Sequence, residues 1–185
     1  MTRGLAITLN ALSLYALAGV LAAAFAAQLL LHELPCPLCL LQRVQFAMLA
    51  IGPILNIRFG PRPSHYAMSL LSAGLGAVVS IRQILLHILP GDPGYGSALA
   101  GYHYYTWALI GFTAAILLLA SMLLFDRQFE DRANSPIAAG PFAGLAVRLV
   151  IALTAANVAS TYLECGLAAC ADNPVVYEML QRGAR

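Results

Sequence analysis

The sequence predicts an all-α integral membrane protein with five transmembrane helices. Of its 185 residues, 61% are hydrophobic and only 10% are charged, whereas about 25% of the residues of an ordinary soluble domain are charged. Five apolar runs are each long enough for a helix across a hydrocarbon core of about 30 Å. None of these runs shows the short alternating pattern of a membrane β-barrel. The net charge of +2 and the lack of a basic run give no support for a nucleic-acid partner.

Each predicted helix follows from an apolar run and its flanking residues, and the connections are too short for a second domain. The first run has no charged residue and exceeds the core of about 7–15 residues of a signal peptide, which favours a retained helix. The fourth begins with tyrosines and a tryptophan, which are typical of a membrane interface. The fifth contains Arg148 and Asn157 but keeps the length of a span. The five predicted spans are residues 5–31, 40–57, 66–89, 104–125 and 138–163.

The arginines predict how these spans are oriented, because basic residues gather in cytoplasmic connections. If every run crosses the membrane, five arginines lie on one side, and the connections on the other side, residues 32–38 and 90–103, contain no lysine or arginine. The amino terminus is therefore predicted to be cytoplasmic, and the carboxyl-terminal tail, residues 164–185, to lie on the opposite face. Arg182 and Arg185 run against this rule. The five arginines of the cytoplasmic side are Arg3, Arg58, Arg62, Arg127 and Arg132.

The segment "LPCPLCLLQR" places two of the four cysteines at the beginning of the second span. Pro37 suits the first position of a helix, because its missing N–H costs nothing there. Cys36 and Cys39 then lie at the amino end of a helix, where partial positive charge and the Cys-x-x-Cys arrangement stabilise a thiolate. The thiolate is the nucleophile of thiol–disulfide exchange. The other two cysteines, Cys165 and Cys170, lie in the tail on the same predicted face, where disulfides persist.

Three further polar residues in the spans are candidates for binding an electron acceptor. Arg43 follows Cys39 by four residues, so both lie on one helical face, and a charge inside a membrane helix indicates a functional site. Arg82 and His87 share the outer part of the third span and supply further polar groups. The alternatives are an arginine that only extends to the interface and a pair of mutually satisfied polar residues between helices.

The chemistry of the cysteines leaves three interpretations open. The two pairs together have the four thiolates of a structural zinc site, and a disulfide from the tail to the bundle would be purely structural. In the redox interpretation, oxidation of a dithiol releases two electrons that need an acceptor. Leu40 after Cys39 excludes a Cys-x-x-Cys-His haem attachment, and the sequence has no glycine-rich nucleotide loop. A quinone dissolved in the membrane is therefore the predicted acceptor, and no metal is expected.

These residues resemble the disulfide bond formation protein B family. The motif "PCPLCLLQR" at a second membrane helix, with a third span and the loop to "YTWALIGF", carries the resemblance, which covers residues 5–125. It implies a four-helix bundle in the bacterial inner membrane that passes electrons from a periplasmic thioredoxin-fold oxidant (DsbA-like) to a quinone, ubiquinone in preference to menaquinone. It further implies that Cys36 and Cys39 are the quinone-coupled pair, with Cys39 in thiolate contact with the quinone. Arg43 would support the quinone, and His87 falls near the family's quinone-proximal histidine in a different local spacing.

The tail departs from the family pattern. The family keeps its second cysteine pair in the outer loop between spans three and four, and here that loop, "PGDPGYGSALAGYH", has no cysteine. We expect Cys165 and Cys170 to take over this role, which requires the fifth span to bring the tail to the same side. The predicted activity is thus a thiol:quinone oxidoreductase in which the tail pair passes electrons to Cys36 and Cys39. The alternative is a non-enzymatic membrane protein with a structural disulfide or zinc clamp.

Overall fold

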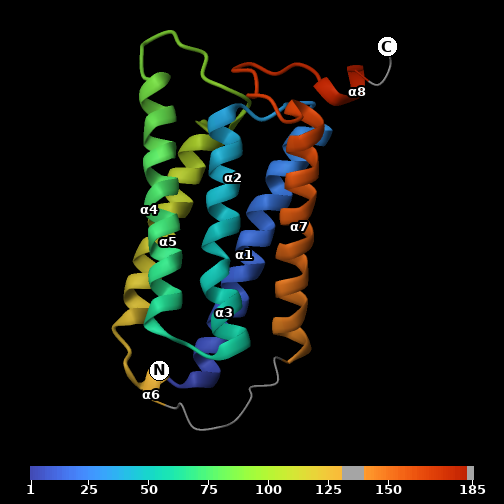
Figure 1. Cartoon of the computed structure of the whole chain (residues 1–185). Coiled ribbons are helices and arrows are strands. Elements are labelled where there is room, and N and C mark those ends of the chain that lie inside the picture. Colours follow the sequence, from blue (N-terminus) through green and yellow to red (C-terminus); the bar gives the residue numbers. More distant parts are fainter. Residues whose placement is uncertain (131–139, 183–185) are drawn as a thin grey trace.

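The structure, a computed structural model, describes residues 1–130 and 140–182. Five long helical segments lie side by side, with short elements at the two ends of the bundle (Figure 1). Three residues used in the sequence analysis, Arg132, Ala138 and Arg185, lie outside the described residues. The long segments are α1 (Arg3–Leu30), α2 (Pro37–Leu49) continued by α3 (Ile51–Phe59), α4 (Pro63–Leu86), α5 (Tyr104–Leu123) and α7 (Pro141–Cys165). The short elements are the hairpin strands β1 (Ala98–Leu99) and β2 (Tyr102–His103), and the helices α6 (Arg127–Glu130) and α8 (Glu178–Arg182).

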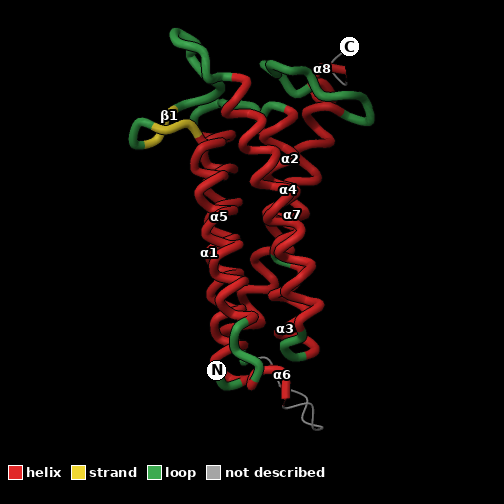
Figure 2. The backbone as a smooth tube through the Cα atoms, turned by 90° about the vertical axis from the view of Figure 1, so that its left-hand side faces the viewer, coloured by secondary structure: helices red, strands yellow, loops and turns green. Residues whose placement is uncertain are grey.

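The long helices confirm the predicted fold class. All five segments are long and apolar enough to cross a membrane, with α2 and α3 together forming the second, Pro37–Phe59. Figure 2 shows them running along one common axis. The third helix begins at Pro63, earlier than predicted, because a proline at the first position of a helix gives up no hydrogen bond. The first helix also begins before its predicted span, at Arg3, and the second begins at Pro37, the predicted first position of that helix.

Aromatic and small side chains hold α2, α4 and α5 together. The rings of Phe46 on α2 and Phe112 on α5 stack with their centroids 4.0 Å apart. Gly76 on α4 leaves room for the Phe112 ring, with which a Cβ at this position would overlap. Helices in a bilayer associate through such close packing, because lipid tails are as apolar as the side chains.

A buried hydrogen-bond network joins α1, α3, α4 and α6 at the end of the bundle remote from the cysteines. The Asn10 amide donates to the Tyr66 hydroxyl at 3.1 Å, and the Asn56 amide donates to the Asn10 side-chain oxygen at 3.0 Å. The Tyr66 hydroxyl in turn donates to the Gln128 side-chain oxygen at 2.9 Å. The His65 ring bonds to Asn56 Oδ1 at 2.9 Å. Because lipid offers no partner for a polar group, this network fixes which helices pair at this end.

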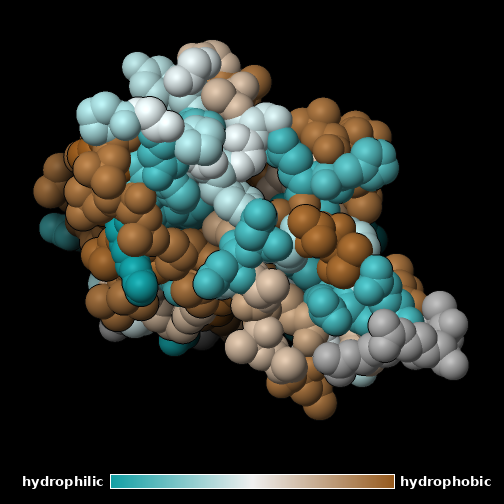
Figure 3. Space-filling view, turned by 90° about the horizontal axis from the view of Figure 1, so that it is seen from above, coloured by the Kyte–Doolittle hydropathy of each residue, from teal (hydrophilic) through white to brown (hydrophobic). Residues whose placement is uncertain are grey.

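The fifth helix, α7, packs along α1 and carries the tail to the cysteine end of the bundle. Near its beginning, the Tyr15 hydroxyl of α1 donates to the Phe142 carbonyl at 3.0 Å. Near its end, the Gln28 amide of α1 donates to the Ser160 hydroxyl at 2.7 Å. The tail after Cys165 and the amino end of α2 therefore lie at the same end of the molecule (Figure 1). Seen from above this end, hydrophilic and neutral residues cover much of the surface and hydrophobic residues surround them (Figure 3).

Candidate active site

Cys36 and Cys39 form a disulfide at the amino end of α2. Pro37 is the first residue of the helix, and Cys36 is its N-cap, whose sulfur accepts the backbone N–H of Cys39 at 3.2 Å. The two Cα atoms lie 5.0 Å apart, within the usual range for a bridged pair. Cys36 is buried and Cys39 is partly exposed. The pair thus has the helix-entrance position in which the helix dipole favours a thiolate.

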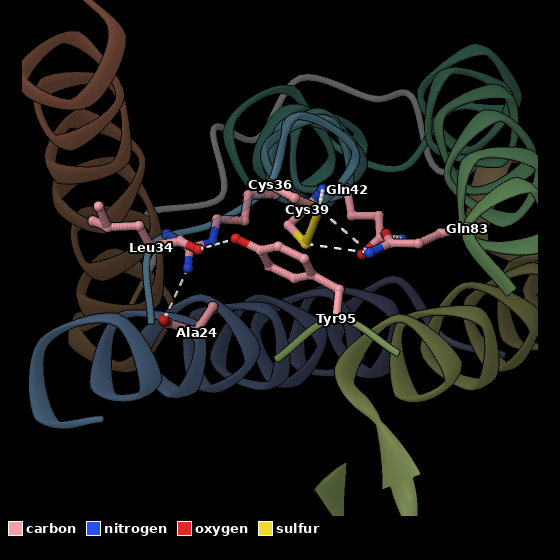
Figure 4. The surroundings of a disulfide bond; sticks show 8 residues. Ala24, Leu34, Cys36, Cys39, Gln42, Gln83 and Tyr95 are labelled. Atoms are coloured by element: carbon pink, nitrogen blue, oxygen red, sulfur yellow. Dashed lines mark hydrogen bonds between the residues drawn. A yellow bond between two sulfur atoms is a disulfide. The ribbon is translucent and has the colours of Figure 1, made fainter. Parts of the chain in front are cut away.

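Gln83 of α4 faces this disulfide from the neighbouring helix (Figure 4). Its amide nitrogen lies 3.3 Å from the sulfur of Cys36 and 3.4 Å from that of Cys39. Its carbonyl oxygen accepts a hydrogen bond from Gln42 at 3.0 Å, which holds the amide in this orientation. A fixed N–H donor beside a sulfur stabilises negative charge there, so Gln83 favours the thiolate form of either cysteine once the disulfide is opened.

A mostly apolar cavity of about 420 Å³ borders Cys39 between α1, α2 and α5. Its polar lining includes Gln42 and Arg43 of α2 and the side chains of Tyr95 and Tyr105. A few polar groups in an apolar wall, at this volume, are typical of a small-molecule site. The described residues that line the cavity include Cys39 but not its partner cysteine, so one sulfur of the pair meets the cavity.

Arg43 is held at the wall of this cavity by contacts with α1 and α7. Its guanidinium donates to the side-chain oxygen of Gln28 at 2.6 Å, to the Ala24 carbonyl at 3.0 Å and to Asn157 Oδ1 at 3.4 Å. It also lies over the Phe25 ring, 5.7 Å from the ring centroid, where a cation is attracted to the aromatic face. The structure therefore brings the predicted arginine and cysteine to one cavity and orients the arginine through two other helices.

Tyr95, in the loop between α4 and β1, lies beside the Cys36–Cys39 disulfide (Figure 4). Its hydroxyl donates to the Leu34 carbonyl at 2.6 Å. Burial, followed by the carboxylates of Glu164 and Glu33, raises the pKa of the Tyr95 phenol. The phenol consequently stays protonated and keeps donating to the segment that leads into α2, which fixes the loop over the site.

Cys165 and Cys170 form a second disulfide at the carboxyl end of α7. Cys165 is buried, Cys170 is partly exposed, and a cavity of about 330 Å³ borders both. The following tail turns back over α1, where the Tyr177 hydroxyl accepts a hydrogen bond from Gln28 at 2.9 Å. Because Gln28 also accepts from Arg43, two hydrogen bonds connect the tail with the arginine of the first site.

The two other predicted binding residues lie at the edge of the site. His87 is the C-cap of α4; its ring Nδ1 is 3.0 Å from Asp92 Oδ1, and its ring stacks 5.7 Å from that of Tyr105, a cavity residue. Hydrogen bonds from the Gly94 N–H, the larger cause, and from the His87 ring hold the pKa of Asp92 below its usual value. Arg82 is exposed on α4 and, like His87, is not among the described residues that line the cavity. Their contact with an acceptor stays a prediction.

The sequence analysis did not identify several residues that build the site. Gln28, Gln42 and Gln83 each interrupt an apolar run, and a polar side chain in a membrane helix usually faces the protein interior, so their positions carried a usable signal. Tyr95 lies in a loop, where no sequence pattern indicated that it would contact the site. Glu164, beside Cys165 in the last turn of α7, was an acidic residue at the end of an apolar run and was also missed.

The zinc alternative needs four free thiolates at one point. In this structure both cysteine pairs are disulfides. Within residues 1–130 and 140–182, no group of three or more His, Cys, Asp or Glu side chains is arranged to hold a metal ion.

Comparison with protein families gives a match to the amino-terminal half of the chain. Residues 7–97 match the family described as "Disulfide bond formation protein DsbB". The matched region contains most of α1 and all of α2 to α4 with the Cys36–Cys39 pair, and it ends in the loop before β1. The tail pair and α7 lie beyond it.

Individual relatives carry the same description. A disulfide bond formation protein B from Xanthomonas axonopodis pv. citri (strain 306) is 38% identical over 86 residues, which cover 44% of this chain and 50% of that protein. The proteins of that name from Marinobacter nauticus and Chromobacterium violaceum are 37% identical over 79 and 83 residues, covering 40% and 42% of this chain and 47% and 49% of theirs. The chain thus spans about half the length of the curated relatives it matches. No solved structure matches it significantly.

Proposed function

We propose that the protein is a thiol:quinone oxidoreductase of the bacterial inner membrane, because residues 7–97 match the model of the DsbB family. It reoxidises a periplasmic thioredoxin-fold disulfide donor (DsbA-like) and passes the electrons to a membrane quinone, ubiquinone in preference to menaquinone. The observation that carries this proposal is that Cys39 of a helix-entrance disulfide and Arg43 border one apolar cavity between membrane helices. Disulfide formation removes two electrons from thiols, so it requires an acceptor, and an apolar carrier fits this cavity.

The proposed path contains two thiol–disulfide exchanges before the acceptor. First, the reduced partner opens the Cys165–Cys170 disulfide, in which Cys170 is the more exposed sulfur. Second, the tail dithiol opens the Cys36–Cys39 disulfide. Each exchange moves two electrons and forms one disulfide as it breaks another. The position of both pairs at one end of the bundle supports the second exchange.

The residues around Cys39 prepare its sulfur for the final transfer. The amino end of α2 and the Gln83 amide stabilise the Cys39 thiolate. Arg43 keeps a positive charge at the cavity wall, and its contacts with α1 and α7 hold it there before any ligand arrives. A quinone bound in this cavity supplies an acceptor for two electrons and two protons.

A purified-component assay tests the proposal. The chain, solubilised in detergent, is mixed with a reduced thioredoxin-fold oxidant and a soluble quinone analogue, and quinone reduction is followed by absorbance. We expect one quinone to be reduced for each partner disulfide formed, because both reactions transfer two electrons. Absence of quinone reduction, together with stoichiometrically bound zinc, would instead support the structural clamp.

Arg43→Ala tests the binding side of the cavity. We expect the quinone concentration for half-maximal rate to rise about 10–100-fold, since a hydrogen bond to a charged group contributes about 1.5–3 kcal/mol. Arg43→Lys should rescue only partly, because lysine lacks the planar fork of donors. The measurement is initial rate against quinone concentration in the same assay.

Arg148→Ala is the matched control, because Arg148 is an exposed arginine of α7 that bonds only within its own helix, to the Gly144 carbonyl, among the contacts of the described residues. Its quinone dependence should stay at the wild-type level. Arg82→Ala in the same titration decides whether that predicted residue also contacts the acceptor. A wild-type quinone dependence in Arg43→Ala would remove Arg43 from the binding site.

A further inference from the structure

Glu164 is a buried carboxylic acid that the proposed electron path does not use. It lies in the last turn of α7, directly before Cys165, and only 2% of its surface is exposed. Neither of its side-chain oxygens has a hydrogen-bond partner among the residues that the structure describes. A buried polar group without a partner costs free energy, so its presence here requires an explanation beyond packing.

The surroundings of Glu164 connect it with both disulfide sites. Together with Cys165 and Cys170 it lines the cavity at the carboxyl end of α7. Its carboxyl also interacts electrostatically with Arg43 of the first site. The Glu164 carboxyl also interacts electrostatically with the phenol of Tyr95, which lies beside the first disulfide. Glu178 lines the same cavity but is exposed to solvent.

The position of Cys165 makes a free thiolate unfavourable. Cys165 is the last residue of α7 and is buried. The carboxyl end of a helix carries partial negative charge, which repels an anion, and burial disfavours any unpaired charge. This is the reverse of Cys36, which lies at the amino end of its helix. When the tail disulfide opens with Cys165 as the leaving sulfur, that sulfur needs a proton at once.

We propose that Glu164 is the acid–base group of the tail disulfide. The thiolate of the incoming partner attacks Cys170, the more exposed sulfur, and forms a new S–S bond as the Cys165–Cys170 bond breaks. The electron pair of the broken bond stays on the Cys165 sulfur, which takes the proton of the Glu164 carboxyl. The products are a mixed disulfide on Cys170, a neutral Cys165 thiol and a Glu164 carboxylate near the Arg43 cation.

The same group completes the cycle in the reverse direction. When the tail pair passes its electrons to Cys36–Cys39 and becomes a disulfide again, Cys165 must lose the proton that it gained. The Glu164 carboxylate takes that proton back and is ready for the next partner. Buried and without a donor, the carboxyl is stable in its uncharged form, while Arg43 stabilises its charged form between the two steps. This inference rests on the proposed function only in assigning electron entry to the tail pair.

Glu164→Gln tests the inference, because glutamine keeps the shape of the side chain but carries no exchangeable acid. The full-length variant, free of quinone, is mixed with dithiothreitol, and the reaction is quenched with an alkylating reagent at set times. The mass of the tail peptide, measured by mass spectrometry, then gives the fraction of tail disulfide that has been reduced. We expect tail reduction to be about 100-fold slower than in the wild type, the lower range for loss of a general acid. Glu178→Gln, a matched change in the same cavity, should react at the wild-type rate.

The pH profile separates acid–base catalysis from a structural role. Expressed per dithiothreitol thiolate, the wild-type rate should fall as pH rises and Glu164 loses its proton. Glu164→Gln should show no such fall, and Glu164→Asp should restore it. A wild-type rate in Glu164→Gln, or a slow rate with the wild-type pH profile, would overturn the inference. Because this measurement needs no quinone, failure of quinone reduction would refute the proposed function alone.

Discussion

Replacing Cys39 with serine will abolish quinone reduction by dithiols. Cys39 is the sulfur of the membrane pair that borders the apolar cavity, and a serine hydroxyl neither forms a disulfide nor ionises to a nucleophile near neutral pH. Cys36→Ser should have the same effect, since it leaves Cys39 without its partner. Quinone absorbance, with dithiothreitol as the electron donor, measures the loss down to the uncatalysed rate.

Both variants should remain folded in the membrane. A disulfide across three positions closes a very short loop, and constraining so short a loop contributes only about 2 kcal/mol. The control is the same cysteine-to-serine change in the tail, because small dithiols that reach Cys36–Cys39 directly should still drive quinone reduction there. Near-normal turnover in Cys36→Ser or Cys39→Ser would end the oxidoreductase proposal.

Cys165→Ser and Cys170→Ser should each block oxidation of the soluble thioredoxin-fold partner. The tail disulfide cannot form in either variant, so partner thiols lose their proposed entry point. In Cys165→Ser, the partly exposed Cys170 should be trapped in a mixed disulfide with the partner, visible as a mass shift on a non-reducing gel. Undiminished partner oxidation in both variants would show that electrons enter elsewhere.

The proposed periplasmic position of the tail is tested by a separate labelling experiment. After mild reduction, a membrane-impermeant thiol reagent applied to intact spheroplasts should label Cys165 and Cys170. Labelling only after permeabilisation would place the tail in the cytoplasm and refute this route. The neighbouring Glu178 and Asp172 of the tail are charged and keep this segment in water, so reagent access is expected.

The helices could be predicted because each one follows from local sequence. An apolar run of spanning length defines a membrane helix wherever it packs, and all five predicted runs correspond to helices of the structure. Pro37 correctly predicted the beginning of the second helix, whereas the beginning of α4 at Pro63 was missed because its run was counted from residue 66. The packing of α7 along α1 could not be predicted, since both helices are apolar on most sides.

From the sequence, only those site residues that belong to the same helix could be placed together. Cys36, Cys39 and Arg43 share α2, so their spacing was enough to place them together. The contacts of Arg43 with Asn157 and of Cys39 with Gln83 join residues from different helices. Such contacts depend on how the helices pair, which a helical period does not encode. For the same reason the roles of Arg82 and His87 stay predictions, and the quinone titration of Arg82→Ala tests the first of them.

The buried network of Asn10, Asn56 and Tyr66 also acts on the opposite end of the molecule. A helix is stiff along its axis and rises about 1.5 Å per residue, so the level at which Tyr66 is bonded sets the level of Gln83, about 25 Å further along α4. A slide of α4 by one residue would displace the Gln83 amide by about 1.5 Å from its position 3.3 Å from the Cys36 sulfur, breaking that contact. The network thus sets the axial position of α4, and through it the contact between Gln83 and the disulfide, although none of the network residues lies at the cysteine end of the bundle.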